Sequence, residues 1–330
     1  MNKKNIDIIL PWRIGDALLN IPMLVCLKQL NEQTNSNYRI RILTQPFLSK
    51  LFKATDIFDC KPLSLARRAI SHFNPSDKAF FVETTSKNFG YYAKKTYGLS
   101  NPCKKRLKFD VEMPFLNLDN LNENLPSKLV SFLRDEKKLS LYTVSLFGVC
   151  LELGYSVDQI IETFDFKLDS VSLEKFSKPV KAVCQDKYVV FCMEAAYGRK
   201  GDAFRRWDEN NFFEIAHRCN KDLSLKSVFV GLDTSVKLPD KDYLIDKRKK
   251  LNLFQLAQLL KLSECYIGND TGPLHIANLV QKRSIGVYFR EKSLTDFSPL
   301  FPELNVQIFK PEGPEDVLTL VTDLLSKPVK

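Results

Sequence analysis

The segment 268–275 contains the residues whose types and spacing say most about chemistry. It reads Gly-Asn-Asp-Thr-Gly-Pro-Leu-His and lies between two apolar runs, 264–267 and 276–279. This order predicts a strand, a tight loop and a helix, with Pro273 at the first helical position and Thr271 or Gly272 as the N-cap. The free N–H groups at such a helix start bind anions. A phosphate-bearing ligand is therefore the first hypothesis, and an ordinary strand-to-helix turn is the alternative.

Alternating apolar segments predict the elements that must position this loop. In the first half, the patterns indicate strands at 6–10, 40–43 and 79–82, helices at 17–30 and 47–54, and a long helical region at 127–153. In the second half, they indicate strands at 188–193, 227–230, 265–267 and 285–289, and helices at 209–219, 253–262, 273–280 and 314–325.

This alternation predicts two doubly wound α/β domains in tandem, residues 1–170 and residues 171–330. The polar, lysine-rich stretch 166–187 is the expected interdomain segment. Ligands of such domains bind beyond the carboxyl ends of the strands. The loops around Asp16 and Asp270 both lie at such ends.

The charge of the chain favours anionic partners. The 330 residues carry a formal net charge of +10, and 44% of them are hydrophobic, which is sufficient for a large core. The basic residues gather at 67–68, 104–108, 137–138 and 247–250. Nucleic acid, phospholipid and a phosphorylated substrate all fit this charge, whereas solvated loops and helix ends are the alternative. Because no zinc-finger spacing or RNA-recognition motif is present, we expect no nucleic-acid partner.

Several classes of protein lose their main support. The eight cysteines include no Cys-x-x-Cys pair and the three histidines are far apart, so we expect reduced, buried thiols and no metal site. No Gly-x-Gly-x-x-Gly follows the first strand, and no phosphate loop ending in Gly-Lys-Ser/Thr occurs. No apolar run approaches the roughly 20 residues of a membrane span, and no signal peptide is recognised. We expect a cytoplasmic protein that its charge attaches peripherally to the inner face of the cytoplasmic membrane.

Three segments together carry a resemblance to a known family. They are the Arg-Ile-Gly-Asp-Ala-Leu-Leu-Asn-Ile-Pro stretch at 13–22, the Arg-Arg-Trp of 205–207 with the apolar helix at 212–216, and the motif at 268–277. In order and spacing, the chain resembles glycosyltransferase family 9, the lipopolysaccharide heptosyltransferases. The third segment is similar to the family's Asp-Thr-Gly-x-x-His-x-Ala motif and is the most specific of the three.

The resemblance implies a GT-B fold, in which two Rossmann-like domains face a central cleft. It implies that the N-terminal domain binds the acceptor and the C-terminal domain binds the nucleotide sugar. The implied reaction is a metal-independent, inverting transfer without a cofactor. The default donor is ADP-heptose, and the acceptor is a phosphorylated glycolipid, either the lipopolysaccharide core or another surface glycan.

Asp16 matches the family's catalytic aspartate. An inverting transfer needs one base that removes the proton of the acceptor hydroxyl as its oxygen attacks. Arg13 and Gly15 belong to the same loop and are expected on the acceptor side. The alternative role for Asp16 is to cap the helix that begins at Ala17, and the two roles can coexist.

On the donor side, Arg205 matches the family's phosphate-contacting lysine, with Arg206 beside it and Lys200 as a further candidate. A planar guanidinium suits a diphosphate, and pairing of both arginines with Asp202 or Asp208 on the surface is the alternative. Thr271 and Gly272 would offer backbone N–H groups and a hydroxyl to the departing diphosphate. Asp270 would brace the loop or accept a bond from a sugar hydroxyl.

His275 would donate to phosphate, and helix packing is its alternative. Gly231 and Asp233 resemble the region where the family holds the ribose and base. Trp207 is expected in the core rather than as a stacking platform. The Asp-Lys-Asp at 240–242 resembles the metal-binding pair of another glycosyltransferase fold, but it stands among lysines with no strand before it. We interpret it as a solvated loop.

The chain departs from the family at three places near the expected donor site. The His-Pro-Gly-like stretch is replaced by 192–198, the Phe-Gly-Pro-Thr-like loop by 288–292, and the usual glycine before the helix at 253 by 246–250. These departures bear on donor identity more than on fold. They motivate an alternative, a non-catalytic protein that binds nucleotide sugars or glycans on a GT-B fold. A nucleotide-sugar epimerase on a similar fold is a third hypothesis.

Overall fold

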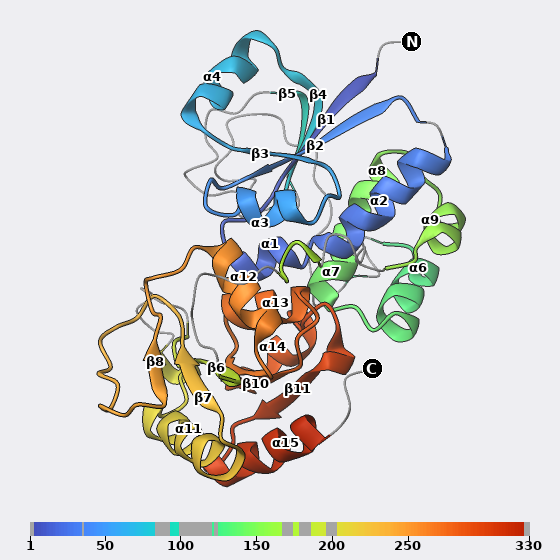
Figure 1. The fold of residues 1–330 in the computed structure, drawn as a ribbon. Helices are drawn as coiled ribbons and strands as arrows, with labels where there is room; N and C mark the ends of the chain where they lie inside the picture. The colour runs from blue at the N-terminus through green and yellow to red at the C-terminus, as the bar shows by residue number, and fades with distance from the viewer. Residues whose placement is uncertain are drawn as a thin grey trace. The chain divides into compact units, whose positions relative to one another are not determined.

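A computed structural model describes residues 3–34, 36–82, 93–98, 121, 125–166, 174–177, 186–195 and 203–326. The chain divides into two compact units, Met1–Ser172 and Leu173–Lys330, and each is built on its own parallel sheet (Figure 1). Most of the expected interdomain segment 166–187 and the candidate Lys200 lie outside the described residues.

The sheet of the first unit has five strands in the order β3-β2-β1-β4-β5. Its strands are β1 (Lys4–Ile9), β2 (Tyr38–Thr44), β3 (Asp59–Pro62), β4 (Ser76–Phe81) and β5 (Ala93–Gly98). Ile6 aligns with Ile40 of β2 on one side and with Lys78 of β4 on the other. Because the chain moves from β1 to β2 on one side and later adds β4 on the other, the strand order reverses beside β1, where ligands of such sheets bind.

The helices of the first unit differ from the predicted ones at two places, where a single helix was expected and the chain forms several. They are α1 (Ile14–Leu18), α2 (Ile21–Gln33), α3 (Ser49–Ala54), α4 (Leu65–Phe73), α6 (Ser127–Ser131), α7 (Leu141–Leu146), α8 (Gly148–Glu152) and α9 (Val157–Thr163). The single helix expected at 17–30 is two helices, because Pro22 has no N–H and its ring excludes the carbonyl of Leu18, where α1 ends. The long region at 127–153 is broken by a π-helical turn, Phe132–Glu136, and by Lys138 at φ 56°.

The sheet of the second unit has six strands in the order β11-β10-β9-β6-β7-β8. Its strands are β6 (Tyr188–Cys192), β7 (Lys226–Phe229), β8 (Leu244–Asp246), β9 (Tyr266–Asn269), β10 (Ser284–Tyr288) and β11 (Asn305–Phe309). The two outermost strands, β8 and β11, were not expected from the sequence, because they are short and only partly buried. The strand order reverses between β6 and β9, so the loops that follow these two strands flank the expected ligand site.

Four helices of the second unit agree with the predicted ones to within a few residues: α11 (Glu209–Leu223), α12 (Leu253–Leu262), α13 (Gly272–Leu279) and α15 (Pro314–Ser326). A further short helix, α14 (Glu291–Asp296), was not predicted. Trp207 is buried in the core of this unit against Phe212, with ring centroids 5.3 Å apart, which confirms its predicted packing role. The stacked rings of Phe191 and Phe229 join β6 to β7 in the same core.

Two further expectations concern thiols and membrane spans. The six cysteines in the described part of the chain are buried and unpaired, as predicted: Cys26, Cys60, Cys150, Cys192, Cys219 and Cys265. Among the described helices, none alone is long and apolar enough to cross a bilayer, although the bent pair Leu141–Glu152 and Val157–Thr163 has that length and composition together.

The close packing of β9 gives a test of this core. A Cβ on Gly268 would meet the Tyr266 side chain and lie 2.7 Å from the carbonyl oxygen of Cys192 on β6. We expect Gly268→Ala to lower the free energy of unfolding by about 1–3 kcal/mol, measured by urea denaturation. Gly313→Ala is the control, because a Cβ there meets nothing within 4 Å. Equal stability of the two variants would contradict this packing.

Candidate functional site

The loop between β9 and α13 has the predicted form of an anion site. Thr271 is the N-cap in an extended conformation, at φ −148° and ψ 175°, and its side chain makes no capping hydrogen bond. The helix begins at Gly272, so Pro273 takes the second helical position rather than the first. Pro273 has no N–H, and the N–H of Leu274 donates to the Thr271 carbonyl at 3.1 Å. The N–H of Gly272 therefore remains for a ligand at the carboxyl end of β9.

The side chain of Arg205 binds to this loop. Its Nη2 donates to the Asp270 carboxylate at 2.7 Å and to the Asp270 carbonyl at 2.9 Å, and the two side chains are only 18% and 10% exposed. Asp270 thus braces the loop, and its negative charge is compensated beside the helix start. Arg205 is thus paired with Asp270 and not with Asp208. Asp208 instead accepts from the N–H of Asn210 at the start of α11, and Asp202 lies outside the described residues.

A buried amide holds these segments together. Asn269 is fully buried; its Oδ1 accepts from the N–H of Trp207 at 3.2 Å, and its Nδ2 donates to the carbonyl of Met193 at 2.6 Å. One side chain therefore ties the Arg205 segment to the ends of both β6 and β9. Asn269 was not among the predicted site residues, although its position at the end of a buried strand was the available signal.

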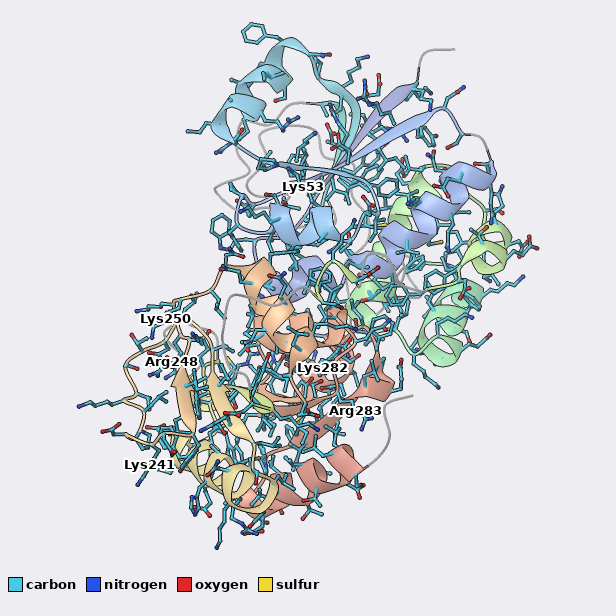
Figure 2. The ribbon with its side chains drawn as sticks, in the orientation of Figure 1. Lys53, Lys241, Arg248, Lys250, Lys282 and Arg283 are labelled. Carbon is cyan, nitrogen blue, oxygen red and sulfur yellow. The ribbon has the colours of Figure 1, made fainter. Side chains whose placement is uncertain are left out.

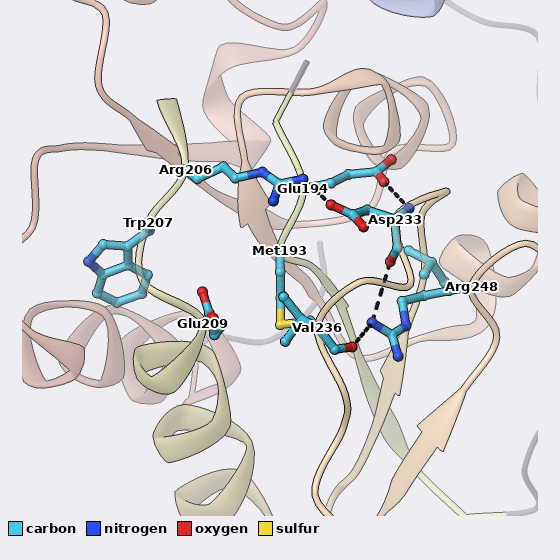
Figure 3. Close-up of a pocket in the computed structure, with 9 residues that line it drawn as sticks. Met193, Glu194, Arg206, Trp207, Glu209, Asp233, Val236 and Arg248 are labelled. Carbon is cyan, nitrogen blue, oxygen red and sulfur yellow. Dashed lines mark hydrogen bonds and ion pairs between the residues drawn. The ribbon is translucent and has the colours of Figure 1, made fainter. Parts of the chain in front are cut away.

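A second charged group lies at the carboxyl ends of β6 and β7 (Figure 3). Arg206 pairs with the Asp233 carboxylate and not with Asp208. Ser235 donates to the same carboxylate through its N–H and hydroxyl, and these bonds, with Arg206, lower the pKa of Asp233 to about 2. At neutral pH this group is therefore a carboxylate that can accept further hydrogen bonds.

Glu194 braces the loop that carries Asp233. Its carboxylate accepts the backbone N–H groups of Leu232 and Asp233, each at 2.7 Å, while burial raises the pKa of Glu194. Gly231 lies against it at φ 126°, and a Cβ there would be 2.9 Å from the Glu194 carboxyl carbon. Sequence reasoning missed Glu194, although it stands within the stretch that departs from the family pattern.

Arg248 is a further residue that the sequence analysis did not single out. It was grouped with the basic residues at 247–250, yet it is buried, binds both carboxylate oxygens of Asp246 and donates to the carbonyl of Val236 at 2.7 Å. The Lys250 ammonium group donates to the backbone carbonyl of the same Asp246; Figure 2 labels Lys250 and Arg248. Arg248 therefore supports the loop between β7 and β8 and forms one wall of a small pocket with Glu194.

His275 lies one turn into α13 and is buried. In the described part of the chain its Nδ1 has no hydrogen-bond partner, and burial lowers its pKa below the ordinary value of 6.5. A neutral imidazole can donate one N–H to an anion at the helix start. This position is compatible with both alternatives, which are packing of the His275 ring in the core and donation of a hydrogen bond to a ligand.

In the first unit, Asp16 lies inside the first turn of α1 and is not its N-cap. The N-cap is Arg13, at φ −75° and ψ 139°, so the predicted capping role of Asp16 is wrong. The helix starts earlier than expected, at Ile14, which includes Gly15 and Asp16 in it. The Asp16 carboxylate lies 3.4 Å from the Arg13 guanidinium at the carboxyl end of β1, so Arg13, Gly15 and Asp16 form one local group.

Residues 240–242 are exposed in a loop, which confirms the interpretation of Asp240 and Asp242 as solvated. Within the described ranges, no group of three His, Cys, Asp or Glu residues is arranged to hold a metal ion. Two groups of predicted site residues thus lie together in the second unit. Arg205 lies with residues 270–275, and Arg206 lies with Gly231 and Asp233.

Two Rossmann-like units with an anion-binding helix start at a switch point are typical of GT-B glycosyltransferases. Residues 143–307 match the model of glycosyltransferase family 9, the heptosyltransferase family, and they amount to half of the 330 residues. The chain belongs to this family and is a glycosyltransferase. Comparison with curated protein sequences gave no match.

Solved structures share the fold. The ADP-heptose lipopolysaccharide heptosyltransferase II of Escherichia coli has a TM-score of 0.69 at 14% identity, covering 98% of both chains. The E. coli heptosyltransferase WaaC with ADP has a TM-score of 0.64 at 13% identity, covering 97% of this chain and 99% of that one. The iron-containing dodecameric glycosyltransferase TibC of enterotoxigenic E. coli has a TM-score of 0.52 at 12% identity, covering 94% and 64%. The predicted α/β GT-B fold is confirmed.

The burial of His275 predicts a pH effect on stability. Because the unfolded chain takes up a proton near pH 6.5 that the folded chain resists, stability should be lost as the pH falls from about 7 to about 5. We expect His275→Gln to reduce this loss, measured as the difference in Tm between the two pH values. The exposed His217→Gln is the control. An equal loss in wild type and His275→Gln would contradict the assignment.

Proposed function

We propose that this glycosyltransferase moves a sugar from a nucleotide diphosphate donor to a glycolipid hydroxyl, with inversion and without a metal. The default donor is ADP-heptose. The observation that carries the proposal is the meeting of Arg205 and Asp270 with the N-terminus of α13 at the end of β9. A compensated acid, an arginine and a free N–H group together suit the diphosphate of a leaving nucleotide.

The second unit would hold the donor. Arg205 uses Nη2 for both of its bonds to Asp270, and the remaining guanidinium N–H groups make no other bond within the described ranges. They are available to a diphosphate in the planar geometry that arginine offers. His275 would donate to the same anion, and Thr271 and Gly272 would supply a hydroxyl and N–H groups.

Gly231 and Asp233 would bind the ribose of the nucleotide. The Asp233 carboxylate stays ionised far below neutral pH and can accept bonds from the two ribose hydroxyls. Lys200 keeps its proposed place near the phosphates as an expectation from the family resemblance.

Asp16 would be the general base. The acceptor hydroxyl gives its proton to the Asp16 carboxylate while its oxygen bonds to the anomeric carbon. The bond from that carbon to the diphosphate breaks on the opposite face, and the nucleoside diphosphate leaves. One base and one leaving-group site suffice for inversion. Arg13 and Gly15 would contribute on the acceptor side.

Metal independence is part of the proposal and rests on the groups that can meet the departing charge. Arg205 and the α13 N-terminus supply cationic and N–H contacts that a divalent ion would otherwise supply. The related TibC is iron-containing, so transfer by this protein should be measured with and without a chelator. Equal rates in the two conditions would support the proposal, and loss of transfer with the chelator would contradict it.

The acceptor is proposed to be a phosphorylated glycolipid at the inner face of the cytoplasmic membrane, with the lipopolysaccharide core as the default. The net charge of +10 supports a phosphorylated acceptor and an anionic surface, since both attract a basic protein.

Calorimetry against a panel of nucleotide sugars tests the donor site. We expect heat of binding with ADP-heptose or another nucleotide diphosphate sugar, and about ten- to hundredfold weaker binding for Arg205→Ala, because a charge-assisted bond is lost. Arg218→Ala, which breaks a surface pair with Asp222 in the same unit, is the control. If the folded protein bound no member of the panel, the donor assignment would be wrong.

Replacement of Asp16 tests the base. We expect Asp16→Asn to lower kcat by about 10²–10⁴-fold with little change in donor affinity, since the amide cannot take the acceptor proton. The transfer rate with the best donor from the panel is the measurement. Asp59→Asn, a removal of an exposed carboxylate in the same unit, is the control. A wild-type rate in Asp16→Asn would contradict the assignment of the base.

A further inference from the structure

Helix α4 of the first unit turns its apolar side chains to solvent. Leu65, Ile70 and Phe73 are 77%, 59% and 92% exposed. At 100° per residue these three, together with Ala66 and Ala69, occupy one arc of the helix, and all five are exposed. A surface helix of a globular protein ordinarily buries such an arc. This helix has the opposite orientation.

The orientation of α4 is set by its polar side. Ser71, on the opposite arc, is buried, and its Oγ donates to the carbonyl of Arg68 at 2.6 Å. At the helix start, the hydroxyl of Ser64 accepts the N–H of Arg67 at 3.2 Å. Figure 1 shows α4 at the rim of the first unit, in the connection from β3 to β4. The apolar arc is therefore presented outward by a capped helix.

The charged residues of α4 are both cationic. The helix contains Arg67 and Arg68 and no acidic residue, and His72 is its other polar basic side chain. By helical geometry, Arg67 flanks the apolar arc on the side of Ile70, and His72 flanks it on the side of Leu65. Arginines beside an apolar face match a bilayer surface, where acyl chains receive the apolar residues and anionic headgroups meet the cations.

We propose that α4 is an interfacial helix that docks the first unit on a bilayer of anionic phospholipid. Leu65, Ile70 and Phe73 enter the boundary between headgroups and acyl chains. A second protein is a poorer fit, because a stable interface needs about 800 Å² on each partner and a nine-residue helix offers far less. Insertion of α4 is a contact in addition to the attraction of the net positive charge. It does not depend on which sugar is transferred.

The test is sedimentation of the full chain with vesicles. Wild type should bind vesicles of equal parts phosphatidylglycerol and phosphatidylcholine, and bind far less to phosphatidylcholine alone. The triple variant Leu65→Ser, Ile70→Ser, Phe73→Ser should partition about tenfold less or weaker still, because apolar insertion is lost. Phe309→Ser, which removes an exposed aromatic residue from β11, is the matched control and should bind as wild type does.

Folding of the variants is checked by thermal unfolding, and the single variant Phe73→Ser replaces the triple variant if the latter fails to fold. Unchanged vesicle binding by the folded variant, or no binding by wild type, would overturn the proposal. So would a wild type that self-associates without lipid through a face that the variant disrupts, because a second copy would then cover α4. Transfer to a water-soluble acceptor should be unchanged in the variant, so failure of docking and failure of the proposed transfer are measured separately.

Discussion

The geometry of the candidate site in the second unit of this glycosyltransferase depends on the amide of one buried asparagine. Asn269 accepts from the N–H of Trp207 and donates to the carbonyl of Met193, so both ends of its amide are satisfied. A buried amide with an unmet partner is costly, and this cost selects the arrangement in which all three segments meet. Arg205 reaches Asp270 because Trp207, two residues further along, is held in this way.

Around this centre, each acidic group is engaged before a ligand arrives. Asp270 is held by Arg205, and Asp233 by Arg206 and Ser235. Uncompensated carboxylates beside a diphosphate would repel it, whereas paired ones leave the arginines and helix N–H groups to act on the anion. The same pairing fixes the loops in place, which would reduce the cost of ordering them when the proposed nucleotide binds.

The departures from the family pattern have a structural meaning. Glu194 stands where family members carry a His-Pro-Gly-like stretch, and its carboxylate holds the N–H groups of Leu232 and Asp233. Arg248 belongs to the stretch 246–250, which replaces the usual glycine before α12, and it binds Asp246 and the carbonyls of the β7–β8 loop. Both residues line the small pocket beside Asp233, where the donor is proposed to bind.

The sequence by itself determined the elements whose signals are local. α12 was predicted at 253–262, as observed. Its start is encoded locally, because Asn252 and Gln255 form a capping box within four residues of each other. The strand, loop and helix around Asp270 were likewise readable, since their apolar runs and proline need no distant partner. Pro22 is a local signal of the same kind, since its clash with the carbonyl of Leu18 separates α1 from α2, but the prediction of one helix at 17–30 did not use it.

Only the tertiary structure decided which charges meet and which faces stay open. Arg205 and Asp270 are 65 residues apart, and Glu194 and Asp233 are 39 apart, so no spacing rule joins them. The apolar residues of α4 form a helical pattern that ordinarily predicts burial, yet the fold buries Ser71 instead. Local propensity sets where a helix forms, but its neighbours in space decide which side it buries, because burial is a property of the packed chain.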